Sequence, residues 1–192
     1  MDRATNAYDA AAAKYAEDWH EQAPPADLHA LIRRFFNTGE TADFGCGSVR
    51  EVARLPAHGF SPVGYDASQG LLAEARSRYP GCRFELAVLP ELAKIASGVF
   101  DNVLCETVIM HLPQAEIAPS VRRLIAILKD SGILSLSWRV TVAADRRDSQ
   151  RLYSAFPTDP ARNELRGAAI LLDEEAVRES SGNVVHRIVA RR

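Results

Sequence analysis

Cysteine is scarce in this sequence, and long apolar runs are missing. The three cysteines, Cys46, Cys82 and Cys105, lie far apart and form no Cys-x-x-Cys pair. This spacing argues against a disulfide framework and gives no zinc-ligand pattern, so we expect no bound metal. The first ten residues are polar, and no stretch reaches the roughly 20 apolar residues that a membrane span requires. These absences predict a cytoplasmic protein with no membrane partner.

An excess of one charge is also lacking. The chain has 23 lysines and arginines against 25 aspartates and glutamates, which gives a formal net charge of -2. Proteins that bind nucleic acid normally carry a basic surface, so no nucleic-acid partner is favoured. Hydrophobic residues make up 47% of the 192 residues, and no repeat, low-complexity tract or linker divides them. This composition predicts one globular domain.

The apolar pattern alternates between helical and strand-like periods. This alternation is typical of an α/β protein with a parallel, doubly wound sheet. The predicted helices cover residues 7–20, 26–36, 49–55, 69–79 and 114–128. The predicted parallel strands cover residues 41–44, 61–66, 82–87, 100–106 and 133–140, with a turn at 129–132. Two later strand-like runs, 168–174 and 184–190, predict an antiparallel pair at one edge of the sheet.

A glycine-rich turn follows the first predicted strand. Gly45, Cys46 and Gly47 stand between that strand and a predicted helix. Glycines let the backbone approach a ligand closely, and the amino-terminus of the next helix favours an anionic group. Nineteen residues after Gly47, Asp66 ends the second predicted strand. An acid at that place accepts hydrogen bonds from ribose hydroxyls, so the pattern predicts an adenosine site.

The turn departs from two common nucleotide motifs. A dinucleotide fingerprint would place a third glycine where Arg50 stands, and a P-loop would need a Gly-Lys-Ser/Thr sequence that is absent. Arg50 could instead pair with a carboxylate of the ligand. The alternative is a tight turn with two glycines and a solvated aspartate.

Several segments in this order resemble class I S-adenosylmethionine-dependent methyltransferases of the small type 11/25 kind. They are DFGCGSVREVARL, VGYDASQGLLAEAR and FDNVLCETVIMHL, and the resemblance extends over roughly residues 8–138. It implies a Rossmann-like sheet of seven strands in the order 3-2-1-4-5-7-6, with the last strand antiparallel. It also implies S-adenosyl-L-methionine as cofactor. Residues 1–192 would form one methyltransferase domain, with 1–37 as a helical lid and 38–192 as the sheet core.

The resemblance assigns most of the expected cofactor contacts. The glycine turn would hold the methionine portion of the cofactor. Asp66 would bind the ribose, and residues later in the chain would contact the adenine. Val49 stands where the family usually has a further glycine, and Val88 where it often has an acid that binds the adenine amino group. The full expected set is Tyr15, Asp43, Gly45, Cys46, Gly47, Arg50, Asp66, Ala67, Leu71, Val88, Leu89, Glu106 and Thr107.

His111 is the candidate for proton transfer because its ordinary pKa is near neutral and it follows the fourth predicted strand. It would act as a base or a substrate contact; the alternative is a structural histidine. Tyr8, Tyr15 and Trp19 share one helix face, which would either cover the cofactor or pack on the sheet. The expected substrate contacts are Tyr8, His111, Trp138 and Arg139.

Three functions follow from this pattern. The first is an enzyme that transfers a methyl group to a small-molecule acceptor by in-line displacement, which requires a positioned nucleophile and a water-poor pocket. The second is a methyltransferase acting on RNA or protein. The third is a protein of the same fold that binds the cofactor without catalysis. We expect a monomer or a homodimer.

Overall fold

A parallel sheet with helices on both faces is built from the alternating segments. The computed structural model describes residues 3–22, 25–48, 55–140, 145–148, 151–178 and 182–192. The helix expected at 49–55 lies outside these residues except for Leu55. The helical elements are α1 (Arg3–Ala10), α2 (Ala12–Glu21), α3 (Ala26–Phe35), η1 (Leu55–His58), α5 (Gln69–Arg78), η2 (Ile109–His111), α6 (Gln114–Ala126) and α7 (Asp159–Glu164).

The main sheet has seven strands in the order β3-β2-β1-β4-β5-β9-β8. Strands β1 to β5 pair in parallel, and β9 runs antiparallel to both β5 and β8. When only the strands of this sheet are numbered along the chain, β8 and β9 become the sixth and seventh. The order is then 3-2-1-4-5-7-6, so the predicted topology is confirmed. Strands β6 and β7 form a separate antiparallel pair. The strands are β1 (Gly39–Phe44), β2 (Phe60–Asp66), β3 (Arg83–Leu86), β4 (Phe100–Glu106), β5 (Leu128–Arg139), β6 (Arg146–Asp148), β7 (Arg151–Tyr153), β8 (Ala169–Val177) and β9 (Val184–Arg191).

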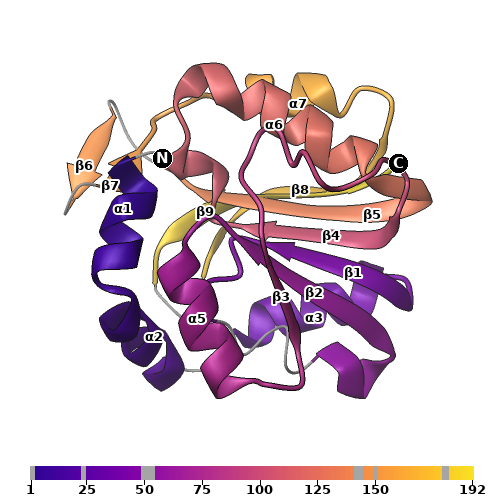
Figure 1. Ribbon diagram of the computed structural model, residues 1–192. Helices are drawn as coiled ribbons and strands as arrows, with labels where there is room; N and C mark the ends of the chain where they lie inside the picture. The colour runs from indigo at the N-terminus through magenta and orange to yellow at the C-terminus, as the bar shows by residue number, and fades with distance from the viewer. Residues whose placement is uncertain (1–2, 23–24, 49–54, 141–144, 149–150, 179–181) are drawn as a thin grey trace.

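Successive residues of a strand point to opposite faces, and both faces of this sheet are covered. On one face, Val103 and Cys105 of β4 belong to the main core together with residues of α6 and α7. On the other face, Leu104 packs against Leu28 and Ile32 of α3. Figure 1 shows α6 and α7 together on one side, with α1 and α2 beside α5 and the β6–β7 pair next to α1.

The amino-terminal helix is divided, although the sequence predicted one helix over 7–20. The break lies at Ala11, whose φ and ψ are -128° and 25°. Asp9 of α1 accepts hydrogen bonds through Oδ1 from the Ser68 hydroxyl at 2.6 Å and from Gly70 N at 2.8 Å. These bonds satisfy donors in the first turn of α5. The break therefore lets α1 be tied to the start of α5 while α2 packs along it.

The turn expected at 129–132 is a bulge inside β5. The pairing of β4 with β5 moves from Phe100–Leu128 to Asn102–Ile133, and Ser131 has a φ of 65°. The last residue of the chain holds this bulge, since Ser131 N donates to the Arg192 carbonyl and Arg192 N donates to the Gly132 carbonyl. Pairing of Leu128 with Phe100 of β4 extends β5 back beyond the bulge, whereas pairing with β9 begins at Ile133. Within the described ranges, no helix is both long and apolar enough to cross a membrane.

Candidate functional site

Two adjoining cavities open at the carboxyl ends of the parallel strands. The larger has a volume of about 620 Å³ and the smaller about 310 Å³. Cavities of this size accommodate small molecules, and this end of an α/β sheet is where ligands bind. Six residues line both cavities and form the wall between them: Trp19, Gly45, Glu106, Thr107, Met110 and Arg139.

The glycine turn is folded back onto the neighbouring strand. The N–H groups of Gly45 and Cys46 both donate to the Tyr65 carbonyl, at 2.8 and 3.0 Å. Gly45 and Gly47 have φ values of 71° and 58°, in the left-handed region that favours glycine. A Cβ on Gly45 would collide with the side chain of Val108, and one on Gly47 would lie 2.7 Å from the Trp19 ring. The turn therefore has no room for a side chain at either of these two glycines.

We expect Gly45→Ala to destabilise the protein by about 3 kcal/mol, since a left-handed backbone costs an alanine about 1–2 kcal/mol and overpacking adds about 1–3 kcal/mol. Urea denaturation would measure this loss. The double variant Gly45→Ala/Val108→Ala removes the collision and leaves the backbone cost. It should therefore be more stable than the sum of the two single changes predicts. Additive losses would show that Val108 does not restrict the turn.

Asp66 joins the glycine turn to the start of α5. Its Oδ2 accepts from Gly47 N at 2.8 Å, and its Oδ1 accepts from Ser68 N at 2.8 Å. Burial raises the pKa of Asp66, and these backbone N–H groups partly offset that rise. A carboxylate has about four acceptor positions, so the backbone bonds from Gly47, Ser68 and Ala67 still leave acceptor capacity. Asp66 lines the larger cavity, where the remaining capacity is available to a ligand diol.

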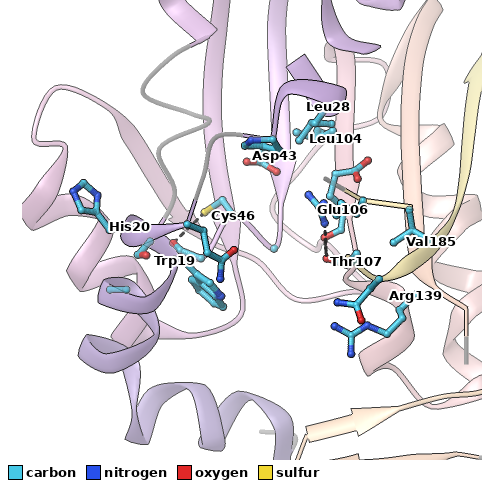
Figure 2. Close-up of a pocket in the computed structure, with 18 of the residues that line it drawn as sticks. Trp19, His20, Leu28, Asp43, Cys46, Leu104, Glu106, Thr107, Arg139 and Val185 are labelled. Atoms are coloured by element: carbon cyan, nitrogen blue, oxygen red, sulfur yellow. Dashed lines mark hydrogen bonds between the residues drawn. The ribbon is translucent and has the colours of Figure 1, made fainter. Parts of the chain in front are cut away.

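Glu106 and Thr107 end β4 at the wall between the cavities. The Glu106 carboxylate accepts from the hydroxyls of Ser135 and Ser137, at 3.1 and 2.6 Å. Thr107 has a φ of 58°, an uncommon conformation for a β-branched residue, and its hydroxyl donates to the Glu106 carbonyl at 2.7 Å. Strained backbone of this kind is concentrated at functional sites. Figure 2 shows Glu106 and Thr107 between Asp43 on one side and Arg139 on the other.

His111 of η2 is held by two elements, α1 and β7, that lie far from each other in the sequence. Its Nδ1 lies 2.6 Å from the Leu152 carbonyl, and its Nε2 lies 3.5 Å from the Tyr8 hydroxyl. Because a carbonyl only accepts, Nδ1 carries the proton and Nε2 is the basic nitrogen of the neutral ring. The Tyr153 ring packs edge-on against His111, with centroids 4.9 Å apart. His111 lines the larger cavity together with both tyrosines.

Comparison with known proteins identifies the family. Residues 42–136 match a family model described as a methyltransferase domain. This matched segment belongs to the methyltransferase family. The matched segment contains the glycine turn, Asp66 and the end of β4, so the resemblance predicted from these motifs is confirmed. No curated protein sequence matches the chain.

Solved methyltransferases share the fold. A 1,6-didemethyltoxoflavin-N1-methyltransferase from Burkholderia thailandensis is 19% identical, with a TM-score of 0.71 over 98% of this chain and 86% of that one. A TehB-like S-adenosylmethionine-dependent methyltransferase from Corynebacterium glutamicum is 15% identical, with a TM-score of 0.72 over 95% and 99% of the two chains. One from Mesorhizobium loti is 19% identical, with a TM-score of 0.69 over 85% and 96%. The Rossmann-like methyltransferase fold is thus confirmed.

Most residues expected in the methyltransferase site lie at the two cavities. The smaller cavity is lined by Asp43, Cys46 and Gly47. Gly45, Glu106, Thr107 and Arg139 line both cavities. The larger cavity is also lined by Tyr8, Asp66, Ala67, Leu71, Val88, Leu89 and His111. The Cys46 side chain itself packs into a small core cluster beneath the turn, so the thiol faces away from solvent.

Two of the expected site residues that the structure describes, Trp138 and Tyr15, do not line these cavities. Trp138 is buried in the main core and stacks on His186 at 4.7 Å. It follows Ser137 and precedes Arg139, so the alternation of a strand turns it to the opposite face of the sheet. Tyr15 lines neither cavity and stacks on Trp19, with centroids 5.6 Å apart. Arg50, like Val49, lies outside the described residues.

The expected lid at 1–37 divides into two parts. Residues of α1 and α2 line the cavities, whereas α3 contributes only Leu28 within the described lining, packs on the sheet and is joined to β9 by an ion pair of Asp27 with Arg187 at 2.7 Å. Trp19 of α2 lines both cavities. The sequence indicated this position for Trp19, because it shares a helix face with Tyr8 and Tyr15. Tyr153 and Arg178 were not expected as site residues. They reach the cavities through tertiary packing, for which the sequence gives no local sign.

Proposed function

We propose that this methyltransferase uses S-adenosyl-L-methionine to methylate a small-molecule acceptor by in-line displacement. The observation that carries the proposal is the position of Asp66. Its carboxylate binds the glycine turn and still borders the larger cavity. A group placed there accepts the ribose hydroxyls of a nucleoside.

The two cavities fit the two halves of this cofactor. Asp66, Ala67, Leu71, Val88 and Leu89 would surround the adenosine in the larger cavity. The methionine half would lie in the smaller cavity, where the backbone of Gly45 and Gly47 allows close approach and Asp43 supplies a carboxylate for the ammonium group. Such a cofactor supplies an electrophilic methyl group on a sulfonium. The wall formed by Glu106 and Thr107 would then border the reacting centre.

A small acceptor is supported by the way the site is covered. Trp19 and Tyr8 of the amino-terminal helices and Tyr153 of β7 line the larger cavity around His111. The neighbour from Burkholderia thailandensis contains bound 1,6-didemethyltoxoflavin together with S-adenosylhomocysteine. The net charge of -2 gives no support to an extended nucleic-acid partner.

His111 would take the proton of the acceptor. The Leu152 carbonyl fixes the ring so that Nε2 is directed at the Tyr8 hydroxyl in the larger cavity. A histidine oriented through its other nitrogen is typical of a general base. Enclosure by aromatic side chains would exclude water from the reacting groups.

The cytoplasmic location expected from the sequence also stays a proposal. Cys46, Cys82 and Cys105 are free thiols. Burial raises the pKa of each of them, so they are poorly reactive. Free, unreactive thiols suit a reducing compartment. Within the described residues, no group of histidine, cysteine, aspartate or glutamate side chains is arranged to hold a metal ion.

Calorimetric titration with S-adenosylhomocysteine tests the cofactor assignment, and we expect binding of one molecule per chain. Absence of binding at millimolar ligand would leave only a role without this cofactor. Incubating the protein with methyl-labelled S-adenosylmethionine and a cell extract then tests the acceptor class. We expect label in the small-molecule fraction. Label confined to protein or RNA would contradict a small acceptor.

A further inference from the structure

We propose that Arg139 and Arg178 form a clamp for an anionic group of the methyl acceptor, so that the substrates are small organic acids. This inference rests on the function proposed above and names its substrate class. The two arginines stand at the same edge of the sheet. Arg139 is the last residue of β5 and pairs with Val185 of β9, and Arg178 directly follows β8. Both line the smaller cavity.

Arg139 presents a positive charge at the wall between the cavities. It lies on the same strand face as Ser135 and Ser137, which bind Glu106. Its guanidinium lies over the Tyr153 ring, 5.4 Å from the centroid, and forms no ion pair with a carboxylate of the described chain. Contact with a ring face leaves the N–H groups in the guanidinium plane able to bind an oxyanion. Figure 2 shows Arg139 beside Thr107 and Val185.

Arg178 contributes a donor that lacks an acceptor. Its Nη1 lies 3.4 Å from the Thr107 hydroxyl, and its Nε is buried without a hydrogen-bond partner in the part of the chain that the structure describes. Burying a charged donor unsatisfied costs free energy, which a bound anion would recover. The backbone places the side chain, because Arg178 N donates to the Asn183 carbonyl at 2.9 Å.

The balance of charge in the smaller cavity also favours an anion. Besides His20, its charged residues are Asp43, Glu106, Arg139 and Arg178, whose formal charges cancel. The cofactor carries an ammonium, a sulfonium and a carboxylate, so it adds one net positive charge when it binds. An anionic acceptor restores neutrality. We expect the anion beside Arg139 and Arg178 and not deeper in the larger cavity, because that cavity is also lined by the carboxylates of Asp66, Glu91 and Glu116.

The position of the Tyr153 ring indicates suitable probes. The Tyr153 ring lies under the Arg139 guanidinium and packs in a T-shaped arrangement with the His111 ring, so a ring bound beside Tyr153 would lie between the clamp and the proposed base. We therefore choose 3- and 4-hydroxybenzoate and 3- and 4-aminobenzoate, each compared with its neutral amide. The acid and the amide of a pair have nearly the same shape, so a difference in rate reports the charge.

Methyl transfer from labelled S-adenosylmethionine to these pairs tests the clamp. We expect at least one acid to be methylated with a kcat/KM at least about tenfold above that of its amide, given the strength of charge-assisted hydrogen bonds. Arg139→Met and Arg178→Met should each lower kcat/KM for the acid by about 10- to 100-fold and change that for the amide little. Arg139→Lys and Arg178→Lys should recover part of the loss. Arg191→Met, an exposed arginine at the end of β9, is the matched control and should change neither rate.

S-adenosylhomocysteine titration of each protein separates the possible failures. Unchanged affinity together with lost acid preference supports the clamp. Equal rates for acids and amides overturn it, as does an equal loss for both in the arginine variants. If the wild type binds S-adenosylhomocysteine but methylates no probe, the clamp is overturned and the proposed function stands. If the wild type binds none, the proposed function fails as well. Loss of binding in Arg178→Met would assign Arg178 to the cofactor instead.

Discussion

Asp66→Ala is expected to lower the affinity for S-adenosylhomocysteine by at least about 100-fold. Two hydrogen bonds from ribose hydroxyls to a carboxylate contribute about 1.5–3 kcal/mol each. The substitution also removes the acceptor for Gly47 N and Ser68 N, which fixes the glycine turn. Calorimetric titration measures the loss. Asp18→Ala, an exposed aspartate on α2, serves as the control and should bind normally.

The pH dependence of binding gives a second measure of Asp66. Because burial raises its pKa, the carboxylate becomes protonated at a higher pH than the ordinary value of 3.8. Affinity that depends on the ionised form is present above this raised pKa and is lost as the pH falls through it. Wild-type affinity should therefore decline before ordinary aspartates titrate, and the weaker affinity of Asp66→Asn should not follow that decline. If Asp66→Ala bound S-adenosylhomocysteine as tightly as the wild type does, the Asp66 carboxylate would not belong to the cofactor site.

His111→Ala is expected to lower kcat for an acceptor that must lose a proton by about 100-fold, the lower end of what general-base catalysis contributes. The reason is the orientation of the ring by Leu152, which leaves Nε2 as the basic nitrogen near Tyr8. The measurement is the steady-state rate of methyl transfer to a hydroxybenzoate that the wild type accepts as substrate. Affinity for S-adenosylhomocysteine should stay close to that of the wild type, because His111 is not among the residues proposed to hold the cofactor.

Two comparisons distinguish a base from a structural histidine. His58→Ala, an exposed histidine in η1, should leave the rate unchanged. The melting temperature of His111→Ala is the second comparison, and a variant that melts at a lower temperature but keeps kcat would show that His111 only supports the loop.

The candidate site was predictable where its residues follow one another closely in the chain. The glycine turn and Asp66 belong to one strand, crossover and strand, so their mutual position follows from the parallel pairing of β1 with β2. Glu106 and Thr107 were expected from the family resemblance, and the pairing of β4 with β1 places them beside the glycine turn. In contrast, Trp138 was expected at the substrate and lies in the core. A single step along β5 separates it from Arg139, and only the direction of the pleat decides which of the two faces the cavity.

The order of the strands was implied by the family resemblance, whereas the sequence by itself determined the alternation of strands and helices, the antiparallel final strand, the glycine turn and the acid that follows it. These features arise from local periodicity and from backbone geometry, which a few neighbouring residues set. The tertiary structure alone decided that α1 breaks from α2 and is tied to α5 through Asp9, and that His111 meets Tyr8 and Leu152. It also brought Arg139 and Arg178 to one cavity. Contacts between such distant segments depend on how helices and strands pack, which no local pattern encodes.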